Sequence, residues 1–235
     1  MDHFNYRNGH LYAEDVSVAE IAASVGTPFY VYSTATLVRH FKLFDDALDG
    51  LDHCICYAMK AASNQAILKT LGNLGAGMDV VSGGEYRRAI SAGIPSEKIV
   101  FSGVGKTLEE IKLVLQNGIR QFNVESESEL KHISSVASSM NTLAPIAIRI
   151  NPDVDAQTHE KIATGKAENK FGIPLSRARD VYADAAKMPG IDIVGIDLHI
   201  GSQLTNLVPF EKAYQKLANL TQILKQDGHK ITRLD

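Results

Sequence analysis

The chain has 235 residues, of which 45% are hydrophobic and 22% are charged, as in globular proteins with a substantial core. Its formal net charge of −3 gives no positive field for phosphate backbones, which argues against a nucleic-acid partner. The sequence lacks the run of about 20 apolar residues that would predict a membrane span, and its acidic N-terminus is unlike a secretory signal. We therefore expect neither a nucleic acid nor a membrane as partner.

The N-terminal part, residues 1–30, is expected to belong to a separate β domain that leads into a larger domain of residues 31–235. After residue 33, apolar runs alternate with amphipathic segments. The expected strands lie at residues 54–60, 77–82, 98–103, 121–126, 145–152 and 193–201. Expected helices include residues 64–74, 83–93, 107–118 and 126–140, two of which end in glycine. This repeating βα pattern predicts parallel strands joined by right-handed crossovers.

A barrel explains the alternation of side chains along these strands better than an open sheet does. On the strand at 145–151, the isoleucines share one face, while Ala147, Arg149 and Asn151 share the other. On the strand at 193–200, Gly195, Asp197 and His199 form the matching small and polar face. A small, polar face fits a narrow lumen, so we expect the α/β class and a (β/α)8 TIM-type barrel. The chain holds about six of its eight βα units, and ITRLD reads as the opening of a seventh strand.

Five polar residues are expected at or near the carboxyl ends of lumen-facing strands, where α/β barrels carry their catalytic groups. They are Lys60, Asp79, Glu125, Arg149 and His199. The longest βα loop, residues 153–176, follows the fifth strand and includes His159 and Lys170, which are either solvated charges or residues that shape the entrance of the site.

Lys60 lies in the stretch YAMKA, at the end of a strand that we expect to be buried on both faces. Buried lysines are rare unless they are paired or covalently used. Two interpretations remain open from the residues alone: an amine that forms a Schiff base, or a structural lysine paired with Asp79 or Glu125. In the same way, His199 could be a core histidine, Arg149 a salt-bridge partner and Asp79 a strand-end cap.

The two cysteines, Cys54 and Cys56, are separated by one residue on a predicted strand. This spacing is poor for a loop-closing disulfide, and no second cysteine cluster completes a zinc site. We expect reduced thiols, a cytoplasmic location and no metal.

An ordered set of motifs resembles a known family. YAMKA, GAGMDVVSGGE, FSGVGKT, RINPDVDAQTH, TGKAENKFGI and HIGSQ follow the order and approximate spacing found in diaminopimelate decarboxylases, which belong to the alanine-racemase-like, fold-type III pyridoxal 5'-phosphate (PLP) enzymes. The resemblance implies a PLP-binding barrel in which Lys60 binds the cofactor as a Schiff base. It also implies that His199 stacks on the cofactor ring, that Ser202 lies near the phosphate, that Arg149 faces the phenolic oxygen and that Asp79 lies near the lysine.

The activity implied by the resemblance is the PLP-dependent decarboxylation of meso-2,6-diaminopimelate to L-lysine and carbon dioxide, a step of lysine biosynthesis. The family forms homodimers with shared active sites, and it places a phosphate loop, a glutamate and an acid cysteine beyond position 235. A protein made only of residues 1–235 is therefore expected to be inactive. The alternatives are another decarboxylase of the same fold, acting on ornithine, arginine or carboxynorspermidine, a racemase, or a non-catalytic PLP-binding homologue.

Overall fold

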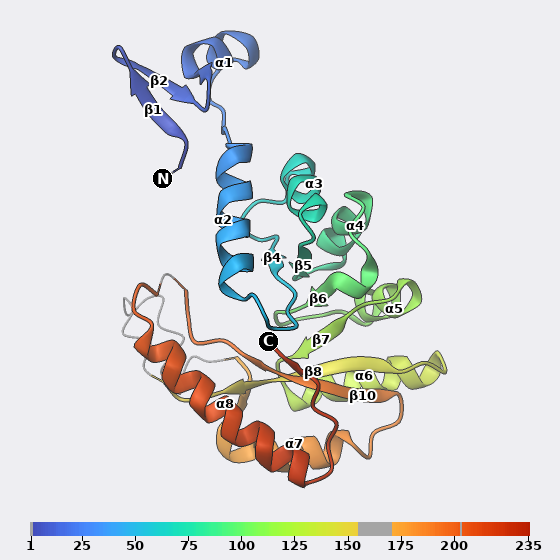
Figure 1. Cartoon of the computed structure of the whole chain (residues 1–235). Coiled ribbons are helices and arrows are strands. Elements are labelled where there is room, and N and C mark those ends of the chain that lie inside the picture. The colour runs from blue at the N-terminus through green and yellow to red at the C-terminus, as the bar shows by residue number, and fades with distance from the viewer. Residues whose placement is uncertain (1, 155–170, 203) are drawn as a thin grey trace.

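The structure is a computed structural model that describes residues 2–154, 171–202 and 204–235 and contains two separate sheets (Figure 1). The smaller sheet is antiparallel, with the order β1-β2-β3. Its strands are β1 (Phe4–Arg7), β2 (His10–Ala13) and β3 (Val16–Ser17), and helix α1 (Val18–Val25) follows them. The N-terminal segment is thus built on β-strands, as predicted, and it protrudes from the rest of the molecule (Figure 1).

The larger sheet is parallel throughout and confirms the predicted βα pattern. Its order is β11-β10-β8-β7-β6-β5-β4, and β9 pairs with β8. The strands are β4 (Cys56–Ala58), β5 (Gly77–Val80), β6 (Ile99–Phe101), β7 (Gln121–Val124), β8 (Ala144–Asn151), β9 (Ile173–Pro174), β10 (Ile191–Leu198) and β11 (Arg233–Leu234). Apart from the short strand β9, strands that follow one another in sequence are neighbours in the sheet, as in a barrel of this class.

Helices cover the outer face of this sheet (Figure 1). They are α2 (Thr34–Ala47), α3 (Gln65–Asn73), α4 (Gly83–Ser91), α5 (Leu108–Asn117), α6 (Glu127–Ser139), α7 (Ala178–Ala185) and α8 (Val208–Gln226). Four of them begin where a Ser or Thr side chain accepts the backbone N–H three residues later, at Ser33, Ser82, Thr107 and Ser126. The predicted glycine ends are also present, since Gly93 and Gly118 have φ angles of 86° and 87°.

The two faces of the parallel sheet differ as the alternation predicts. The outward side chains are almost fully buried under the helices, and Phe101 and Phe122 stack there with ring centroids 6.0 Å apart. The inward face is small and polar: Asp197 lies beside Arg149 across the β10–β8 pair, and Asn123 lies beside Ala147 across the β7–β8 pair. The register therefore places charged side chains in the curled interior of the sheet.

Strand β10 carries one irregularity. Ile193 pairs with Ile146 and Gly195 pairs with Ala147, so Val194 is an extra residue without its own partner on β8. Past this bulge, Gly195 and Asp197 pair with Ala147 and Arg149, so they keep the inward parity predicted from the sequence.

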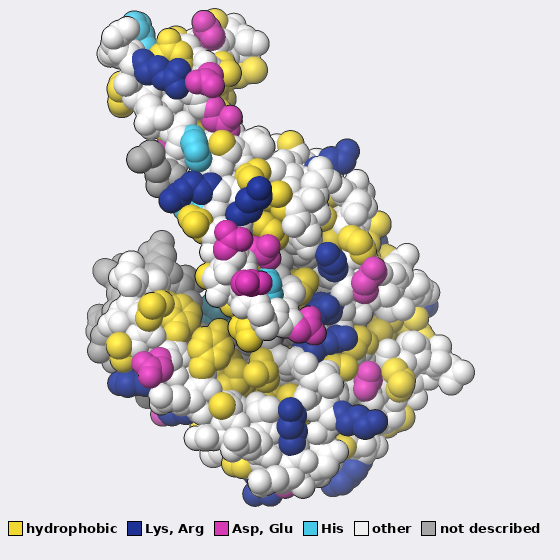
Figure 2. All heavy atoms as spheres, viewed as in Figure 1, with side chains coloured by type: hydrophobic (Ala, Val, Ile, Leu, Met, Phe, Trp, Pro, Cys, Tyr) yellow, Lys and Arg dark blue, Asp and Glu magenta, His cyan; other side chains and the backbone are white. Residues whose placement is uncertain are grey.

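The sheet is curled but open along one side, between β4 and β11. Within the described residues, β4 pairs only with β5, and β11 pairs only with β10. Figure 2 shows hydrophobic side chains gathered in the hollow between α2 and α8. Exposed large hydrophobic residues of the elements around this hollow include Phe44 of α2, Tyr214 of α8 and Leu234 of β11. Across the described part of the chain, we find no helix with the length and apolar character needed to cross a bilayer.

Candidate functional site

The predicted site residues converge at the carboxyl end of the parallel strands. Asp79 and Arg149 lie within β5 and β8, whereas Glu125 and His199 directly follow β7 and β10. Lys60 lies in a turn two residues beyond β4. Fold and register, rather than sequence proximity, bring these five side chains to one end of the lumen.

Lys60 is exposed, so the expectation that it would be buried is wrong. The physical reason is the length of its strand: β4 ends at Ala58, and the chain then turns, with the N–H of Ala61 donating to the carbonyl of Ala58 over 3.1 Å. No hydrogen bond or ion pair engages the Lys60 ammonium within residues 2–154, 171–202 and 204–235. Its charge nevertheless acts on both Asp79 and His199. Within those residues, the structural pairing of Lys60 with Asp79 or Glu125 is not observed.

Arg149 and Glu125 form a close ion pair at the mouth of the lumen. The Arg149 Nη1 atom donates to Glu125 Oε1 over 2.9 Å, and the two side chains are 13% and 1% exposed, respectively. The same Oε1 atom accepts the backbone N–H of Gly103 over 3.1 Å. Glu125 Oε2 is buried, and the described residues provide no hydrogen-bond partner for it.

Asp79 is the second carboxylate with an unsatisfied oxygen. Its Oδ1 atom is buried and has no hydrogen-bond partner among the described residues. Burial raises the pKa of Asp79 to about 6, Asp235 adds to the rise, and a hydrogen bond from Ser102 and the charge of Lys60 oppose it. A carboxyl with this pKa can hold or release a proton close to neutral pH.

His199 lies at the rim, where its side chain is partly accessible to solvent. Partial burial, together with the positive charges of Arg149 and Lys60, lowers the pKa of His199 to about 4. The imidazole is therefore neutral at physiological pH. Ser202 lies three residues further on, in an exposed loop, and the structure shows no hydrogen bond between it and the other described site residues.

A polar layer lies deeper in the lumen. Gln121 Nε2 donates to Asn123 Oδ1 and Asp235 Oδ2, each over 3.0 Å, and Asn123 Nδ2 donates to Ser102 Oγ over 3.1 Å. Asp197 is buried nearby, and burial and Asp235 raise its pKa well above the ordinary range. The alternation of side chains along the sequence predicted Asp197 on the lumen face, whereas Gln121 and Asn123 were not predicted there. The alternation of polar and apolar residues in QFNVES could have revealed them.

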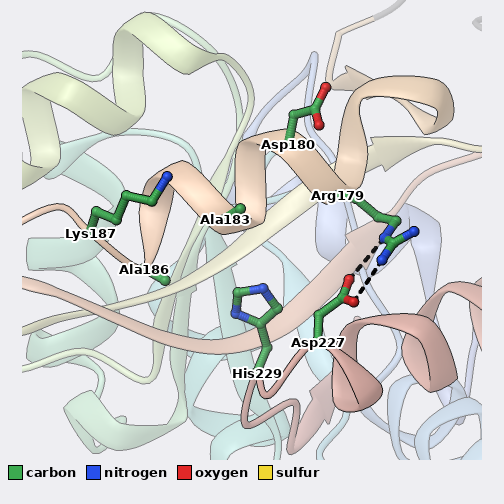
Figure 3. A pocket seen from close by; sticks show the side chains of 7 residues that line it. All are labelled: Arg179, Asp180, Ala183, Ala186, Lys187, Asp227 and His229. Atoms are coloured by element: carbon green, nitrogen blue, oxygen red, sulfur yellow. Dashed lines mark hydrogen bonds and ion pairs between the residues drawn. The ribbon is translucent and has the colours of Figure 1, made fainter.

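A recess of about 500 Å³ lies elsewhere, between α7 and the loop that follows α8 (Figure 3). Its walls include Lys187 and His229, and one edge is formed by Arg179, which donates two hydrogen bonds to Asp227 over 2.8 and 2.7 Å. None of the predicted site residues lines it. His159 and Lys170 fall outside the described residues, so their predicted place near the site entrance is not addressed.

Comparison with known proteins identifies related chains. This chain is 51% identical to a diaminopimelate decarboxylase of Haemophilus influenzae and 52% identical to one of Vibrio cholerae, in each case over its whole length and 57% of the relative. It thus spans little more than half of these relatives. A crystal structure of diaminopimelate decarboxylase from Helicobacter pylori complexed with L-lysine superposes with a TM-score of 0.89 at 42% identity, covering 92% of this chain and 55% of that one.

A family model gives the same result over most of the chain. The family described as "Pyridoxal-dependent decarboxylase, pyridoxal binding domain" matches residues 34–235, which begin at helix α2 and include the whole parallel sheet. The chain therefore belongs to the pyridoxal-dependent decarboxylase family and contains its pyridoxal binding domain.

Proposed function

We propose that the protein containing this chain decarboxylates meso-2,6-diaminopimelate to L-lysine and carbon dioxide. The observation that carries the proposal is the identity of 51% and 52%, over the full length of this chain, with two diaminopimelate decarboxylases. Because this chain spans 57% of those relatives, the activity is proposed for the whole protein rather than for residues 1–235.

The lumen mouth fits PLP in its donor and acceptor chemistry. Lys60 offers an amine that no described residue occupies, and the buried Asp79 Oδ1 atom lacks a partner among the described residues. Buried polar atoms are nearly always satisfied, so unpaired ones at a convergent site are consistent with a missing polar ligand. Lys60, Asp79, Arg149, His199 and Ser202 would hold the cofactor.

The surroundings of four of these residues support a role for each. The free Lys60 amine is suited to covalent attachment of the cofactor aldehyde, and Asp79, with a pKa of about 6, is suited to exchanging a proton with that amine. Neutral His199 can cover one ring face without adding charge, while Arg149 presents a donor at the ring edge. When bound, PLP supplies the electron sink for decarboxylation. This chain's residues orient it and set the local charge.

The proposal extends to assembly and location. We infer a homodimer with a shared active site, and light scattering of the full-length protein would test it. We also infer a cytoplasmic location, which the pair of free thiols supports: Cys54 Sγ and Cys56 Sγ lie 3.9 Å apart, within hydrogen-bond distance for sulfur and without a disulfide between them.

The deciding experiment is a substrate panel offered to the full-length, PLP-loaded protein, with carbon dioxide release as the readout. Meso-2,6-diaminopimelate should give the highest kcat/KM, and L-lysine should accumulate in equal amount. Preference for ornithine, arginine or carboxynorspermidine would replace the proposed substrate. Cofactor binding without any release would identify a non-catalytic homologue.

A further inference from the structure

We infer that Glu125 positions Arg149 for the cofactor, acting together with the backbone of Gly103 and Gly172. The inference rests on the proposed function, because it takes Arg149 as a residue that faces PLP. Glu125 itself then acts through Arg149, so it is a positioning residue.

The first support is the way in which Glu125 is held. Its side chain is 1% exposed, and the Oε1 atom accepts both the Gly103 N–H and the Arg149 Nη1–H. The carbonyl of Gly103 is fixed in turn, since it accepts from Lys106 Nζ over 2.6 Å. A carboxylate bound to rigid backbone has little rotational freedom, so it can define the direction of the guanidinium that it contacts.

Gly172 supports Arg149 from another direction. Its N–H donates to the backbone carbonyl of Glu125 over 3.2 Å, and its φ of +95° is one that side chains rarely adopt. A Cβ atom at Gly172 would lie 2.9 Å from the carbonyl oxygen of Arg149 and 3.1 Å from its Cγ. The glycine of KFGI thus packs directly against the base of the arginine side chain.

A second carboxylate, Asp197, lies close enough to Arg149 to compete with Glu125 for its guanidinium group. Asp197 neighbours Arg149 across the β10–β8 pair and also interacts with its charge. Burial and Asp235 raise the pKa of Asp197, which weakens it as an anionic partner. Without Glu125, the Arg149 charge would still face Asp197 and Asp235, but among residues 2–154, 171–202 and 204–235 no other side chain accepts a hydrogen bond from it.

The variants are chosen to separate orientation from folding. Glu125→Gln keeps an oxygen that can accept from Gly103 and Arg149, but it replaces Oε2 by an amide nitrogen and removes the negative charge of the ion pair. Glu125→Met has a similar volume but no acceptor. The matched control is Asp227→Met, which removes the carboxylate of another arginine pair, Arg179–Asp227, at the recess of Figure 3.

The measurement is the PLP dissociation constant of the full-length protein, followed by the absorbance of the bound cofactor. Glu125→Met should weaken binding at least about tenfold, the scale of a hydrogen bond to a charged group, and shift the absorbance. Glu125→Gln, which keeps an acceptor for Arg149, should bind PLP more tightly than Glu125→Met, and Asp227→Met should bind as wild type does. Arg149→Met combined with Glu125→Met should be no weaker than Arg149→Met alone.

Three results would overturn the inference. One is wild-type affinity in Glu125→Met, and another is additive losses in the double variant. The third is equal loss in Glu125→Gln and Glu125→Met with reduced urea stability, which would show a structural role. None of these three results contradicts the proposed function, provided that the wild-type protein binds PLP. A wild type that does not bind PLP would overturn the proposed function itself, and this inference with it.

Discussion

Two lysines follow strands of the same parallel sheet, and their surroundings are opposite. Lys106, after β6, has a fully buried side chain whose ammonium donates to Gly103 O, Asn123 O and Glu129 Oε1 over 2.6, 2.8 and 2.8 Å. Lys60, after β4, is exposed, and its ammonium has no hydrogen-bond partner among the described residues.

Under the proposed function, in which Lys60 binds the cofactor, the comparison teaches that burial is a poor guide to a reactive lysine. An ammonium has three donors, and at Lys106 all three are used to join the loop after β6 to β7 and α6. Such a group stabilises the fold and offers nothing to a ligand. Lys60 keeps its amine available beside Asp79 and His199, where a covalent bond to a cofactor can form.

The largest expected effect is a difference in covalent reactivity between Lys60 and Lys106. Borohydride reduction of the PLP-loaded full-length protein should fix the pyridoxyl group on Lys60, and peptide mapping by mass spectrometry would locate it. Lys60→Ala should abolish the label while the protein remains folded, because no described contact of the ammonium is lost. A label on Lys106 would contradict both the assignment and the comparison.

The second-largest expected effect is a difference between Lys106 and Lys60 in their contribution to the free energy of unfolding. Lys106→Met leaves Glu129 and two carbonyl oxygens without their buried partner, so we expect a loss of about 3–5 kcal/mol in the free energy of unfolding. Urea denaturation followed by circular dichroism would measure it, with Lys60→Met as the matched control. A change of the same size in both variants would show that Lys60 is also structural.

A third test uses pH, because Asp79 and His199 face Lys60 and shift in opposite directions. Asp79 has a folded pKa of about 6 against an ordinary 3.8, so its stabilising contribution is lost as pH rises through 6. His199 has a folded pKa of about 4 against 6.5, so its contribution is lost as pH falls from 6.5 towards 4.

The free energy of unfolding should therefore be measured between pH 4 and pH 7 in wild type, Asp79→Asn and His199→Gln. Asp79→Asn should remove a decrease of about 2 kcal/mol with rising pH, and His199→Gln should remove an opposite change of under about 1 kcal/mol, reduced by its solvent exposure. Slopes of the same sign for the two residues would be inconsistent with these surroundings.

The smallest effect is expected at the recess of Figure 3. Asp227→Asn weakens a two-bond contact with Arg179 that is as short as the Lys106–Glu129 bond, but the Arg179 side chain is 63% exposed. Exposed ion pairs contribute little because water solvates both partners. The urea midpoint should match that of wild type, and a clear decrease would mean that bond length, rather than burial, explains Lys106.

Sequence patterns predicted much of this architecture because strand alternation and helix ends depend on residues that are close together in the chain. Period-2 alternation placed Arg149, Asp197 and His199 on one face, and the register confirms this for Arg149 and Asp197, which pair across β8 and β10. His199 lies beyond the end of β10, so its face stays a prediction. Glycine ends predicted helix termini at Gly93 and Gly118. These features depend on neighbouring residues, so a single chain is enough to reveal them.

Features that depend on distant residues escaped prediction. The partners that bury Lys106 come from Asn123 and Glu129, 17 and 23 residues away, and only folding brings them together. The exposure of Lys60 follows from the early end of β4 at Ala58, and strand ends are poorly defined by apolar runs. The roles of the individual site residues remain predictions that the experiments above address.

The bulge in β10 also bears on how the length of this strand can vary. Removing Val194 would join Ile193 to Gly195, which already pair with the consecutive residues Ile146 and Ala147, so the segment would become a regular strand. The loss would be the bonds that Thr232 makes to the Val194 carbonyl, over 3.0 and 3.1 Å. Deleting one residue from the regular part, such as Ile196, would instead turn the following side chains to the opposite face. Single-residue deletions should therefore be tolerated at position 194 and rejected two residues later.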